Sequence, residues 1–385
     1  MNTSYAVLHI ALNPHTGAWS VMRELAKAQA ISGQYAGVGI GVIRDREWPA
    51  AYMQELKETG LPFYETTTPK LFGTASFMFQ HIRRPGIEAW ISKFRSLTGA
   101  ERVVVHFHNA WMSGVFLPLR DTKEPETVCV ATFHGVNAEL EGQPLRHSAH
   151  RWMAKRLVAS NARLTSVDGD NLDRARELFN VPQDRFTVIP NGAPQGTNSG
   201  RPFALGDKPF TIGHVGTLSD AKGWKIAVSA VEALQAQNRD VRILIAGTGE
   251  DAGQAEARAR ENPDFISFRG YVQQPRENLM PELDLLTVMS VREGLPMTII
   301  EAQSVGVPVA ATAVGGIPDS VKTGESGFLV DRTSDDLARV IENLYDHPDK
   351  LMRISERTHG FFKDHFAIEI IVEQYHELYT REDSA

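Results

Sequence analysis

Cysteine is almost absent from this 385-residue chain, in which Cys129 is the only one. A lone cysteine excludes an internal disulfide and a cysteine-rich zinc site, and it is typical of a reducing compartment. Long apolar runs are also missing, since none approaches the roughly 20 residues needed to span a bilayer. Residues 1–12 carry no positively charged leader. We therefore expect a cytoplasmic protein that is neither secreted nor membrane-spanning.

Positive charge is scarce as well. The chain has 40 Lys and Arg against 47 Asp and Glu, a net charge of −7. Binding a nucleic acid needs a net or strongly clustered positive field, so we expect no nucleic-acid partner. With 42% hydrophobic and 23% charged residues, the composition is that of a folded globular protein. At this length, two domains of somewhat under 200 residues are expected.

What the sequence does contain is an alternation of short apolar runs with longer stretches of helical period. This pattern predicts an α/β fold of strand–helix–strand units around parallel sheets. The expected strands of the first half are 7–12, 103–107, 128–132, 164–167 and 186–189. Those of the second half are 210–215, 242–246, 266–268, 285–289, 309–311 and 328–330.

A stretch rich in Gly, Pro, Ser and Asn at 192–209 separates the two halves. Such composition is typical of a linker. We therefore predict a first Rossmann-like domain over 1–195 and a second over 205–360. A final helix at about 361–380 is expected to pack back on the first domain.

In parallel sheets, ligands bind beyond the carboxyl ends of the strands, where loops lead into helices with free N–H groups. The sharpest loop of this kind runs through 288–308. Gly294 there would let a ligand approach the backbone, and Pro296 suits the first position of the following helix.

Two glutamates in this segment are candidates for binding a ligand. Glu301 lies more than one turn into the expected helix, where its carboxylate could accept both hydroxyls of a ribose. Glu293 lies in the loop, where it could orient or electrostatically support a transferred sugar. The alternative is that both are solvated glutamates at a helix start, where the helix dipole favours acidic residues.

The context of these glutamates resembles the signature of family 4 retaining glycosyltransferases of GT-B fold. The similarity lies in Glu293-Gly-Leu-Pro, Glu301-Ala, Gly306-Val-Pro-Val and Val314-Gly-Gly-Ile-Pro-Asp. It extends to Thr132-Phe-His-Gly, Val188-Ile-Pro-Asn-Gly, Lys222-Gly, Ile245-Ala-Gly-Thr-Gly-Glu and Gly270-Tyr-Val. Each piece alone is weak, but the combination is specific. The resemblance implies two Rossmann-like parallel-sheet domains facing across a cleft.

The resemblance also implies roles for individual residues. Lys222 would neutralise the diphosphate of a nucleotide-sugar donor, and a fixed cation there would lower the barrier as the leaving group gains charge. Glu293 and His134 would complete the catalytic group. The donor-binding residues would be Gly17, Gly216, Thr217, Tyr271, Val272, Gly294, Leu295, Pro296 and Glu301. The alternative for Lys222 is a solvated lysine before a helix.

The sequence departs from the family pattern at two positions. The family usually has an arginine five residues before the lysine, where this chain has Thr217. Either Arg292 or another cation compensates, or the grip on phosphate is weaker. The first loop ends in Gly17-Ala18, where relatives often have two adjacent glycines. The contact of this loop with phosphate is therefore in doubt.

Two aromatic side chains also have roles implied by the family. Tyr271 and Val272 follow a strand and resemble the segment whose backbone reads the nucleobase; a buried aromatic at a strand exit is the alternative for the tyrosine side chain. His134 resembles the histidine that faces the donor sugar, where it could bond a hydroxyl or support developing charge. A structural histidine is the alternative there.

A metal is not expected. His106 and His108 form an H-x-H, but we expect the two side chains to diverge along their strand and no third ligand to join them. Asp168-Gly-Asp170 matches a D-x-D motif of metal-dependent transferases of another fold, yet it precedes a helical stretch and is interpreted as a helix cap. We expect neither a metal nor another cofactor, since the nucleotide sugar is a substrate.

The acceptor is expected on the first domain. Residues 145–157 interleave basic and apolar side chains, as a helix at a membrane surface does, although a surface helix of the domain is the alternative. The family resemblance implies transfer from a UDP- or GDP-sugar to a glycan or lipid-linked saccharide in bacterial surface polysaccharide synthesis. A nucleotide-sugar epimerase of the same fold and a non-catalytic two-lobed sugar-binding protein are the alternatives.

Overall fold

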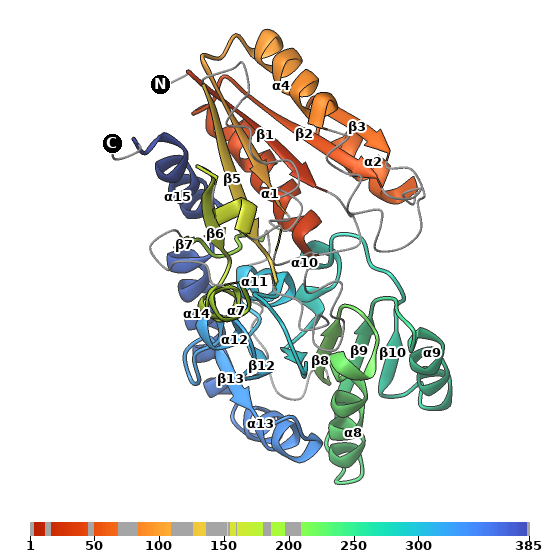
Figure 1. Cartoon of the computed structure of the whole chain (residues 1–385). Helices are drawn as coiled ribbons and strands as arrows, with labels where there is room; N and C mark the ends of the chain where they lie inside the picture. Colours follow the sequence, from red (N-terminus) through yellow and green to blue (C-terminus); the bar gives the residue numbers. More distant parts are fainter. Residues whose placement is uncertain are drawn as a thin grey trace. The chain divides into compact units, whose positions relative to one another are not determined.

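The computed structural model describes residues 4–11, 17–44, 50–67, 84–108, 126–135, 152, 155–158, 160–179, 186–196 and 209–382. Contacts divide the chain into two compact units. The first comprises residues 1–192 and 368–385, and the second comprises residues 193–367. Each unit is built on one parallel sheet (Figure 1). The predicted α/β fold class is confirmed.

The first unit contains a seven-stranded sheet in the order β3-β2-β1-β4-β5-β6-β7. The strands are β1 (Tyr5–Ala11), β2 (Gly37–Arg44), β3 (Phe63–Thr67), β4 (Arg102–Phe107), β5 (Thr127–Phe133), β6 (Arg163–Ser166) and β7 (Phe186–Val188). The described helices are α1 (Gly17–Ser32), α2 (Ala50–Glu58), α4 (Arg84–Thr98), α7 (Gly169–Phe179) and α15 (Ile368–Thr380). All described strand pairings of this sheet are parallel.

The helices of the first unit bury an apolar face against each side of the sheet. Trp19, Met22 and Leu25 recur at helical spacing along α1 and pack in one cluster with α15. Phe94 of α4 lies in the cluster on the other side. Because both faces are covered, the central strands are almost continuously apolar. A polar side chain inside such a strand is therefore conspicuous.

The second unit contains a six-stranded sheet in the order β10-β9-β8-β11-β12-β13. Its strands are β8 (Phe210–Val215), β9 (Val241–Ala246), β10 (Ile266–Phe268), β11 (Leu285–Val288), β12 (Val309–Thr312) and β13 (Gly327–Val330). Its α-helices are α8 (Trp224–Gln235), α9 (Ala252–Glu261), α10 (Pro275–Asn278), α11 (Met297–Ser304), α12 (Ile317–Ser320), α13 (Ser334–Asp346) and α14 (Pro348–His365). Two short 3-10 helices are η5 (Asp220–Lys222) and η6 (Met280–Glu282).

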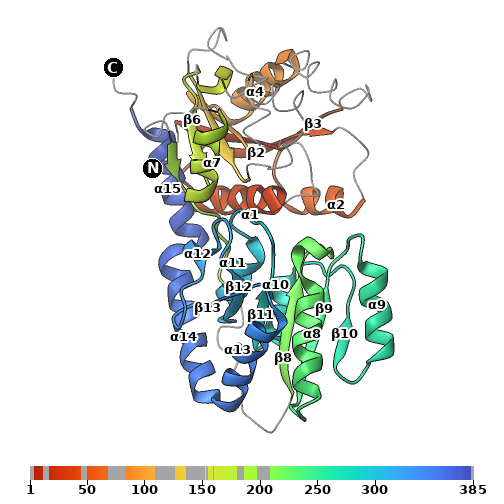
Figure 2. The ribbon, with the colours of Figure 1, turned by 60° about the horizontal axis from the view of Figure 1, so that its bottom comes forward.

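The core of the second unit has the same layered arrangement. Trp224 of α8 and Leu337 of α13 are fully buried against one face of the sheet, and Ile299 of α11 is buried against the other. Figure 2 shows α8 beside β8 and β9, with α9 beside β10. The first turn of α13 is capped by Thr333, whose hydroxyl accepts from the Asp336 amide at 3.2 Å.

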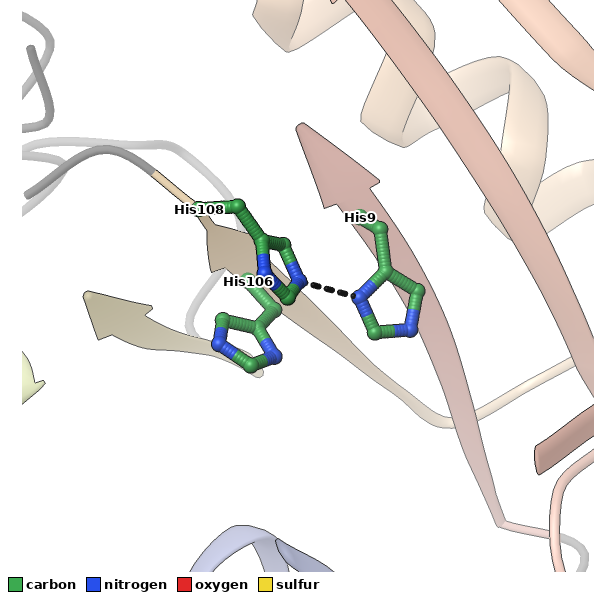
Figure 3. Close-up of side chains that lie close together, drawn as sticks. All are labelled: His9, His106 and His108. Carbon is green, nitrogen blue, oxygen red and sulfur yellow. Dashed lines mark hydrogen bonds between the residues drawn. The ribbon is translucent and has the colours of Figure 1, made fainter. Parts of the chain in front are cut away.

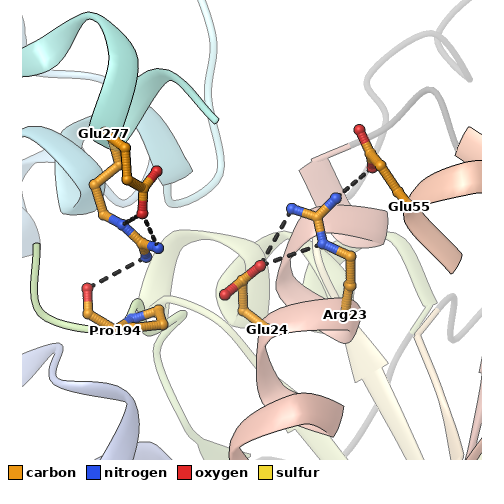
Figure 4. A network of polar contacts seen from close by, with 6 residues as sticks. Arg23, Glu24, Glu55, Pro194 and Glu277 are labelled. Carbon is orange, nitrogen blue, oxygen red and sulfur yellow. Dashed lines mark hydrogen bonds and ion pairs between the residues drawn. The ribbon is translucent and has the colours of Figure 1, made fainter. Parts of the chain in front are cut away.

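Polar contacts fix short segments within each unit (Figure 4). In the first unit, Arg23 of α1 pairs with Glu24 at 3.2 Å and with Glu55 of α2. In the second unit, Arg276 of α10 donates to the Pro194 carbonyl at 3.3 Å and pairs with its neighbour Glu277.

None of the described helices combines the length and apolar character needed to cross a bilayer.

Candidate functional site

The sheet of the second unit reverses its strand order between β8 and β11. The chain moves outward from β8 to β9 and β10, then returns to the other side of β8 for β11, β12 and β13. Ligands of doubly wound sheets bind outside the carboxyl ends of the strands at such a switch point. The loops that follow β8 and β11 are therefore the first candidates, and they contain Gly216 to Lys222 and Met289 to Pro296.

The loop after β8 crosses the loop after β9 at contact distance. The Leu218 amide donates to the Thr248 carbonyl at 2.8 Å. A Cβ on Gly247, whose φ is +144°, would lie 1.7 Å from the Gly216 carbonyl oxygen. Only glycine allows this approach. Gly216 and Thr217 are thereby held at the carboxyl edge, with Thr217 exposed.

Lys222 and Glu293 meet at this edge. The Lys222 Nζ lies 2.6 Å from Glu293 Oε1, and the Ser290 hydroxyl donates to the same oxygen at 2.6 Å. The Lys222 side chain keeps 33% of its exposure, and that of Glu293 keeps 14%. A lysine ammonium has three hydrogens, so it can bind an anion while it stays paired. The sequence predicted both residues for one site, and the structure brings them together.

The position of Lys222 depends on the glycine that follows it. Gly223 adopts the left-handed conformation, with φ +74°, between η5 and α8. A Cβ there would lie 2.2 Å from the Met289 carbonyl oxygen. The Val291 amide also donates to the Ala221 carbonyl at 2.8 Å. The two loops are therefore joined through their backbones as well as through the ion pair.

A third loop, which follows β12, supports the Glu293 segment. The Gly316 amide donates to the Gly294 carbonyl at 3.0 Å. A Cβ on Gly315, whose φ is +55°, would lie 1.9 Å from the Glu293 carbonyl oxygen. The Thr312 hydroxyl donates to the Ser290 carbonyl at 2.7 Å. The backbone from Ser290 to Gly294 is thus anchored along its length.

The prediction that Pro296 occupies the first helical position is wrong. Pro296 lies just before the helix. It is the N-cap, with φ −65° and ψ 126°, and α11 begins at Met297. The extended ψ excludes Pro296 from the helix although its φ suits one. Leu295 is buried beside it. Glu301 is the fifth residue of α11 and is half-buried, so it lies more than one turn into the helix, as predicted.

Three further residues of this unit that the sequence suggested for binding the nucleotide-sugar donor are Tyr271, Val272 and Arg292. Tyr271 and Val272 follow β10, and the Gly270 carbonyl accepts from the Gly247 amide at 2.7 Å. Tyr271 is 53% exposed, so its side chain is not the buried aromatic of the alternative interpretation. Arg292 is exposed.

His214 is a site residue that the sequence analysis missed. It lies in β8, two residues before Gly216, and is 3% exposed. Neither of its ring nitrogens has a hydrogen-bond partner among the described residues. Burial, together with the smaller effect of the nearby Lys222 charge, lowers its pKa to about 4. The available signal was a histidine inside an otherwise apolar strand.

In the first unit, the prediction that His106 and His108 diverge is wrong. Their rings stack with centroids 4.1 Å apart. The physical reason is that residues two apart in a strand point to the same face of the sheet, so the side chains of His106 and His108 lie together. His9 of β1 joins them because β1 and β4 are neighbours and His9 is paired with His106 in register. Figure 3 shows the three rings together.

Two hydrogen-bonded branches run from Gln29 of α1 through this cluster. In one, Gln29 Oε1 lies 2.7 Å from His9 Nε2, and His9 Nδ1 lies 2.9 Å from His108 Nε2. His108 Nδ1 then lies 3.2 Å from His134 Nε2. Burial lowers the pKa of His9 and of His134 to about 4. These rings are therefore neutral at pH 7.

The other branch passes through α15. Gln29 Nε2 donates to the Tyr379 hydroxyl at 3.5 Å, and this hydroxyl lies 2.6 Å from His106 Nδ1. His106 Nε2 lies 2.6 Å from the Thr132 hydroxyl, which lies 2.6 Å from that of Thr165. Burial lowers the pKa of His106 well below its ordinary value.

Within the described ranges, one group of side chains has a spacing that could accommodate a metal ion. One nitrogen from each of His9, His106 and His108 lies within 4.8 Å of the others. The Asp168-Gly-Asp170 motif is a helix cap, as predicted. Asp168 Oδ1 accepts from the Asn171 amide at 2.7 Å, at the start of α7.

Two predicted features of the first unit lie largely outside the described residues. The loop before Gly17 is not described, and Gly17 itself is the exposed first residue of α1. Of the basic segment 145–157, only 152 and 155–157 are described, all of them helical. The Arg156 guanidinium lies over the ring of Trp152, 4.9 Å from its centroid, and Trp152 is 52% exposed.

Both halves of the chain match models of glycosyltransferase domains. Residues 16–192 match the glycosyl transferase 4-like domain, and residues 209–347 match the domain of glycosyl transferases group 1. The fold is that of Anabaena HepE, solved in complex with UDP-glucose. The two are 18% identical with a TM-score of 0.71, over 97% of this chain and 98% of that one. The chain belongs to the GT-B glycosyltransferases.

Curated relatives of this GT-B glycosyltransferase chain include bacterial glycosyltransferases. A 2-deoxystreptamine glucosyltransferase of Streptomyces kanamyceticus is 32% identical over 53% of this chain and 49% of its own length. A D-inositol 3-phosphate glycosyltransferase of Corynebacterium jeikeium is 29% identical over 60% of this chain and 61% of its own. The chain thus spans about half to three fifths of the length of these relatives.

Proposed function

We propose that this GT-B chain transfers a sugar from a UDP- or GDP-sugar to a hydroxyl of a glycan or lipid-linked saccharide, as a family 4 enzyme. The observation that carries the proposal is the Lys222–Glu293 pair at the switch point of the second sheet. A fixed cation there would stabilise the charge that a nucleoside diphosphate gains as it leaves. HepE, which shares the fold, has been solved with UDP-glucose.

The donor would be held by the second unit. Glu301 would accept hydrogen bonds from the ribose hydroxyls, and the amides at the start of α11 would face the diphosphate. Gly216, Thr217, Tyr271 and Val272 would contact the nucleotide from neighbouring loops. Arg292, which is exposed, could replace the arginine that the family usually has at the position of Thr217.

The transfer would retain the configuration of the anomeric carbon and need no metal. The bond from the anomeric carbon to the diphosphate oxygen breaks, and the acceptor oxygen attacks from the same face. The acceptor proton passes to the leaving phosphate. Glu293 would assist by its charge, and Lys222 would supply the positive charge that a metal supplies in other transferases.

The activity is tested with a panel of sugar nucleotides and lipid-linked acceptors. We expect release of nucleoside diphosphate that persists in EDTA, and a product with the anomeric configuration of the donor. Lys222→Met should lower kcat about 10²- to 10³-fold, as loss of one transition-state contact does. Lys225→Met is the matched control, because Lys225 pairs with Asp220 instead, at 2.6 Å.

An unchanged rate in Lys222→Met would reject the assigned site. Inversion at the anomeric carbon, or loss of turnover in EDTA, would reject the proposed mechanism. An epimerised nucleotide sugar without transfer would identify the alternative enzyme class.

We also propose that the protein is cytoplasmic and that residues 145–157 contact a membrane surface. Co-sedimentation of the protein with anionic vesicles tests this contact.

A further inference from the structure

The imidazole cluster of the first unit is a hydrogen-bonded chain whose direction can be deduced. A neutral imidazole carries one N–H donor and one bare nitrogen acceptor. In the chain from His9 through His108 to His134, each link uses one donor and one acceptor. Once the proton position on one ring is fixed, every other ring in the chain is fixed as well.

Gln29 determines the direction at one end. Its carbonyl oxygen faces His9 Nε2 at 2.7 Å, so this nitrogen must carry the proton. His9 Nδ1 is then the acceptor for the His108 Nε2 proton, and His108 Nδ1 is the acceptor for the His134 Nε2 proton. His134 Nδ1 is left unprotonated.

The second branch agrees with this direction. The Gln29 amide donates to the Tyr379 oxygen, which leaves the Tyr379 proton for His106 Nδ1. His106 Nε2 then donates to Thr132. Every protonated ring nitrogen in the two branches then has an acceptor.

The opposite direction would follow if the Gln29 amide were rotated by half a turn. Every link would still be made, but the chain would then end in an N–H on His134. His134 Nδ1 is buried and has no partner among the described residues. An unpaired buried N–H is rarer in proteins than an unpaired acceptor. The end of the chain therefore favours the same direction as Gln29.

We propose that Gln29 orients this imidazole chain so that His134 presents an unprotonated Nδ1 to a ligand hydroxyl. The inference rests on the proposed function, in which the ligand is a sugar. A bare nitrogen accepts a hydrogen bond from a hydroxyl but offers nothing to a phosphate oxygen, which has no hydrogen to donate. Gln29 is thus a positioning residue for the recognition of the sugar, since it acts through other residues.

The distances favour this chain over a metal site. Zinc–nitrogen bonds of about 2.0–2.1 Å in a tetrahedral site would separate two ligand nitrogens by about 3.3 Å. His9 Nδ1 and His108 Nε2 are 2.9 Å apart, the length of a hydrogen bond. Both nitrogens of His106 also have oxygen partners at 2.6 Å.

The test is long-range proton–nitrogen NMR on the full chain with labelled histidine, in which each ring shows which nitrogen carries the proton. His134 is assigned by the signals lost in His134→Asn. We expect Nε2 of His134 to be protonated and Nδ1 to be bare. An Nδ1–H tautomer would overturn the proposal.

Gln29→Glu should reverse the chain. A carboxylate beside His9 favours its doubly protonated form, which takes up one proton from solvent, keeps Nε2–H toward the carboxylate and donates from Nδ1, so that each following ring donates toward His134. The expected result is an Nδ1–H tautomer at His134. Gln54→Glu is the matched control, because Gln54 is exposed on α2 and its side-chain amide donates to its helix neighbour Glu58 at 3.0 Å. An unchanged His134 tautomer in both Gln29→Glu and Gln29→Met would contradict the role of Gln29.

Gln29→Met covers the case in which the buried charge prevents folding. It removes the acceptor at similar volume, so His134 should show both tautomers, and kcat/KM for transfer should fall about three- to tenfold. A single unchanged tautomer in this variant would also overturn the proposal. The NMR readout needs no turnover, so an inactive enzyme with the expected tautomer would count only against the proposed function. Two results together would show that the imidazole cluster is a metal site and not a hydrogen-bonded chain. They are one zinc ion per molecule of purified protein, and imidazole NMR signals that shift when the zinc is removed by a chelator.

Discussion

His214 illustrates at the scale of one residue how burial makes a side chain sensitive to pH. Its pKa falls to about 4 because the ring is buried in β8 and lies near the Lys222 charge. The unfolded chain binds a proton at His214 near pH 6.5, whereas the folded chain does not. The free energy of unfolding therefore decreases as pH falls from about 6.5 toward 4.

We predict that replacing His214 makes the stability of the protein less dependent on pH. One buried histidine contributes up to about 1.4 kcal/mol per pH unit within this window. His214→Phe should flatten the profile by about this amount, as measured by urea unfolding between pH 7 and pH 4.5. His365→Gln, a change at an exposed histidine of α14, is the control. Parallel profiles for the wild type and His214→Phe would contradict the assignment.

At the scale of helices and loops, Gly223 determines how closely two neighbouring loops approach each other. Gly223 allows η5 to pass directly into α8, and a Cβ there would collide with the Met289 carbonyl oxygen. The collision involves backbone, which cannot move aside as the end of a flexible side chain can. The Lys222 loop and the Glu293 loop therefore share a requirement for glycine at this point.

We expect Gly223→Ala to lower the free energy of unfolding by about 1–3 kcal/mol, because it adds backbone strain and a steric clash. Weaker binding of nucleoside diphosphate should accompany the loss. Gly253→Ala is the comparison, since a Cβ on this α9 glycine meets nothing within 4 Å. There the substitution should be neutral or stabilise by up to about 1 kcal/mol. Equal effects of the two substitutions in urea unfolding would refute the steric account.

The end of α15 depends on an arginine from another element. Arg163 of β6 donates to the carbonyls of Leu378 and Tyr379 at 2.6 and 2.8 Å, and to that of Arg381 at 2.6 Å. These are among the last carbonyls of the helix and its exit, which no N–H of the helix itself can satisfy. A cation there also complements the helix dipole.

Arg163→Met should therefore destabilise the first unit by about 1.5–3 kcal/mol, the range for hydrogen bonds to a charged group. Arg174→Met serves as the control, since Arg174 makes an ion pair with Asp170 at the surface of α7. Such pairs contribute about 0.5 kcal/mol. Chemical unfolding of both variants gives the comparison, and a similar small loss in each would remove the capping role of Arg163.

At the scale of the whole molecule, nucleotide binding should be visible as stability. A ligand that binds only the folded chain stabilises it by about 2.7 kcal/mol when present at 100 times its Kd. We predict that UDP or GDP raises the midpoint of thermal unfolding, and that the more effective one identifies the donor base. The measurement is a thermal shift series with both diphosphates.

Glu301→Ala should weaken this shift by raising the Kd about 10- to 100-fold, because the carboxylate's charge-assisted bonds to the ribose are lost. Glu325→Ala, at an exposed position of the same unit, should behave as the wild type. If Glu301→Ala retained the full shift, the ribose would have to be bound elsewhere.

Much of the fold follows from local patterns. Each of the eleven strands that the sequence analysis expected has a counterpart in the structure, most within a residue at each end. Among the described elements, β2 and β3 were not singled out, because their runs at 37–44 and 63–67 contain Gly, Thr and Glu among the apolar residues. The helix begins after Pro296 because the ψ of Pro296 is extended, which the residue type alone does not determine.

Some residues of the candidate site could be named from the sequence, whereas others could be brought together only by the structure. The residues of the Glu293 segment are contiguous and could be named from the sequence. His9, Gln29 and Tyr379 could not be joined to His106, because nothing in the chain between them indicates that they meet. The mistaken expectation for His106 and His108 arose from misapplying the two-residue repeat of a strand.

The sequence by itself determined the parallel α/β pattern, the order of the loops and the identity of the charged residues in them, since these depend on neighbours within a few turns of chain. Only the tertiary structure decided that Lys222 pairs with Glu293, 71 residues away, and that Tyr379 bonds His106 across 273 residues. Such meetings depend on which strands lie side by side in a sheet. The packing of the whole unit sets that order, and a local stretch of sequence does not specify it.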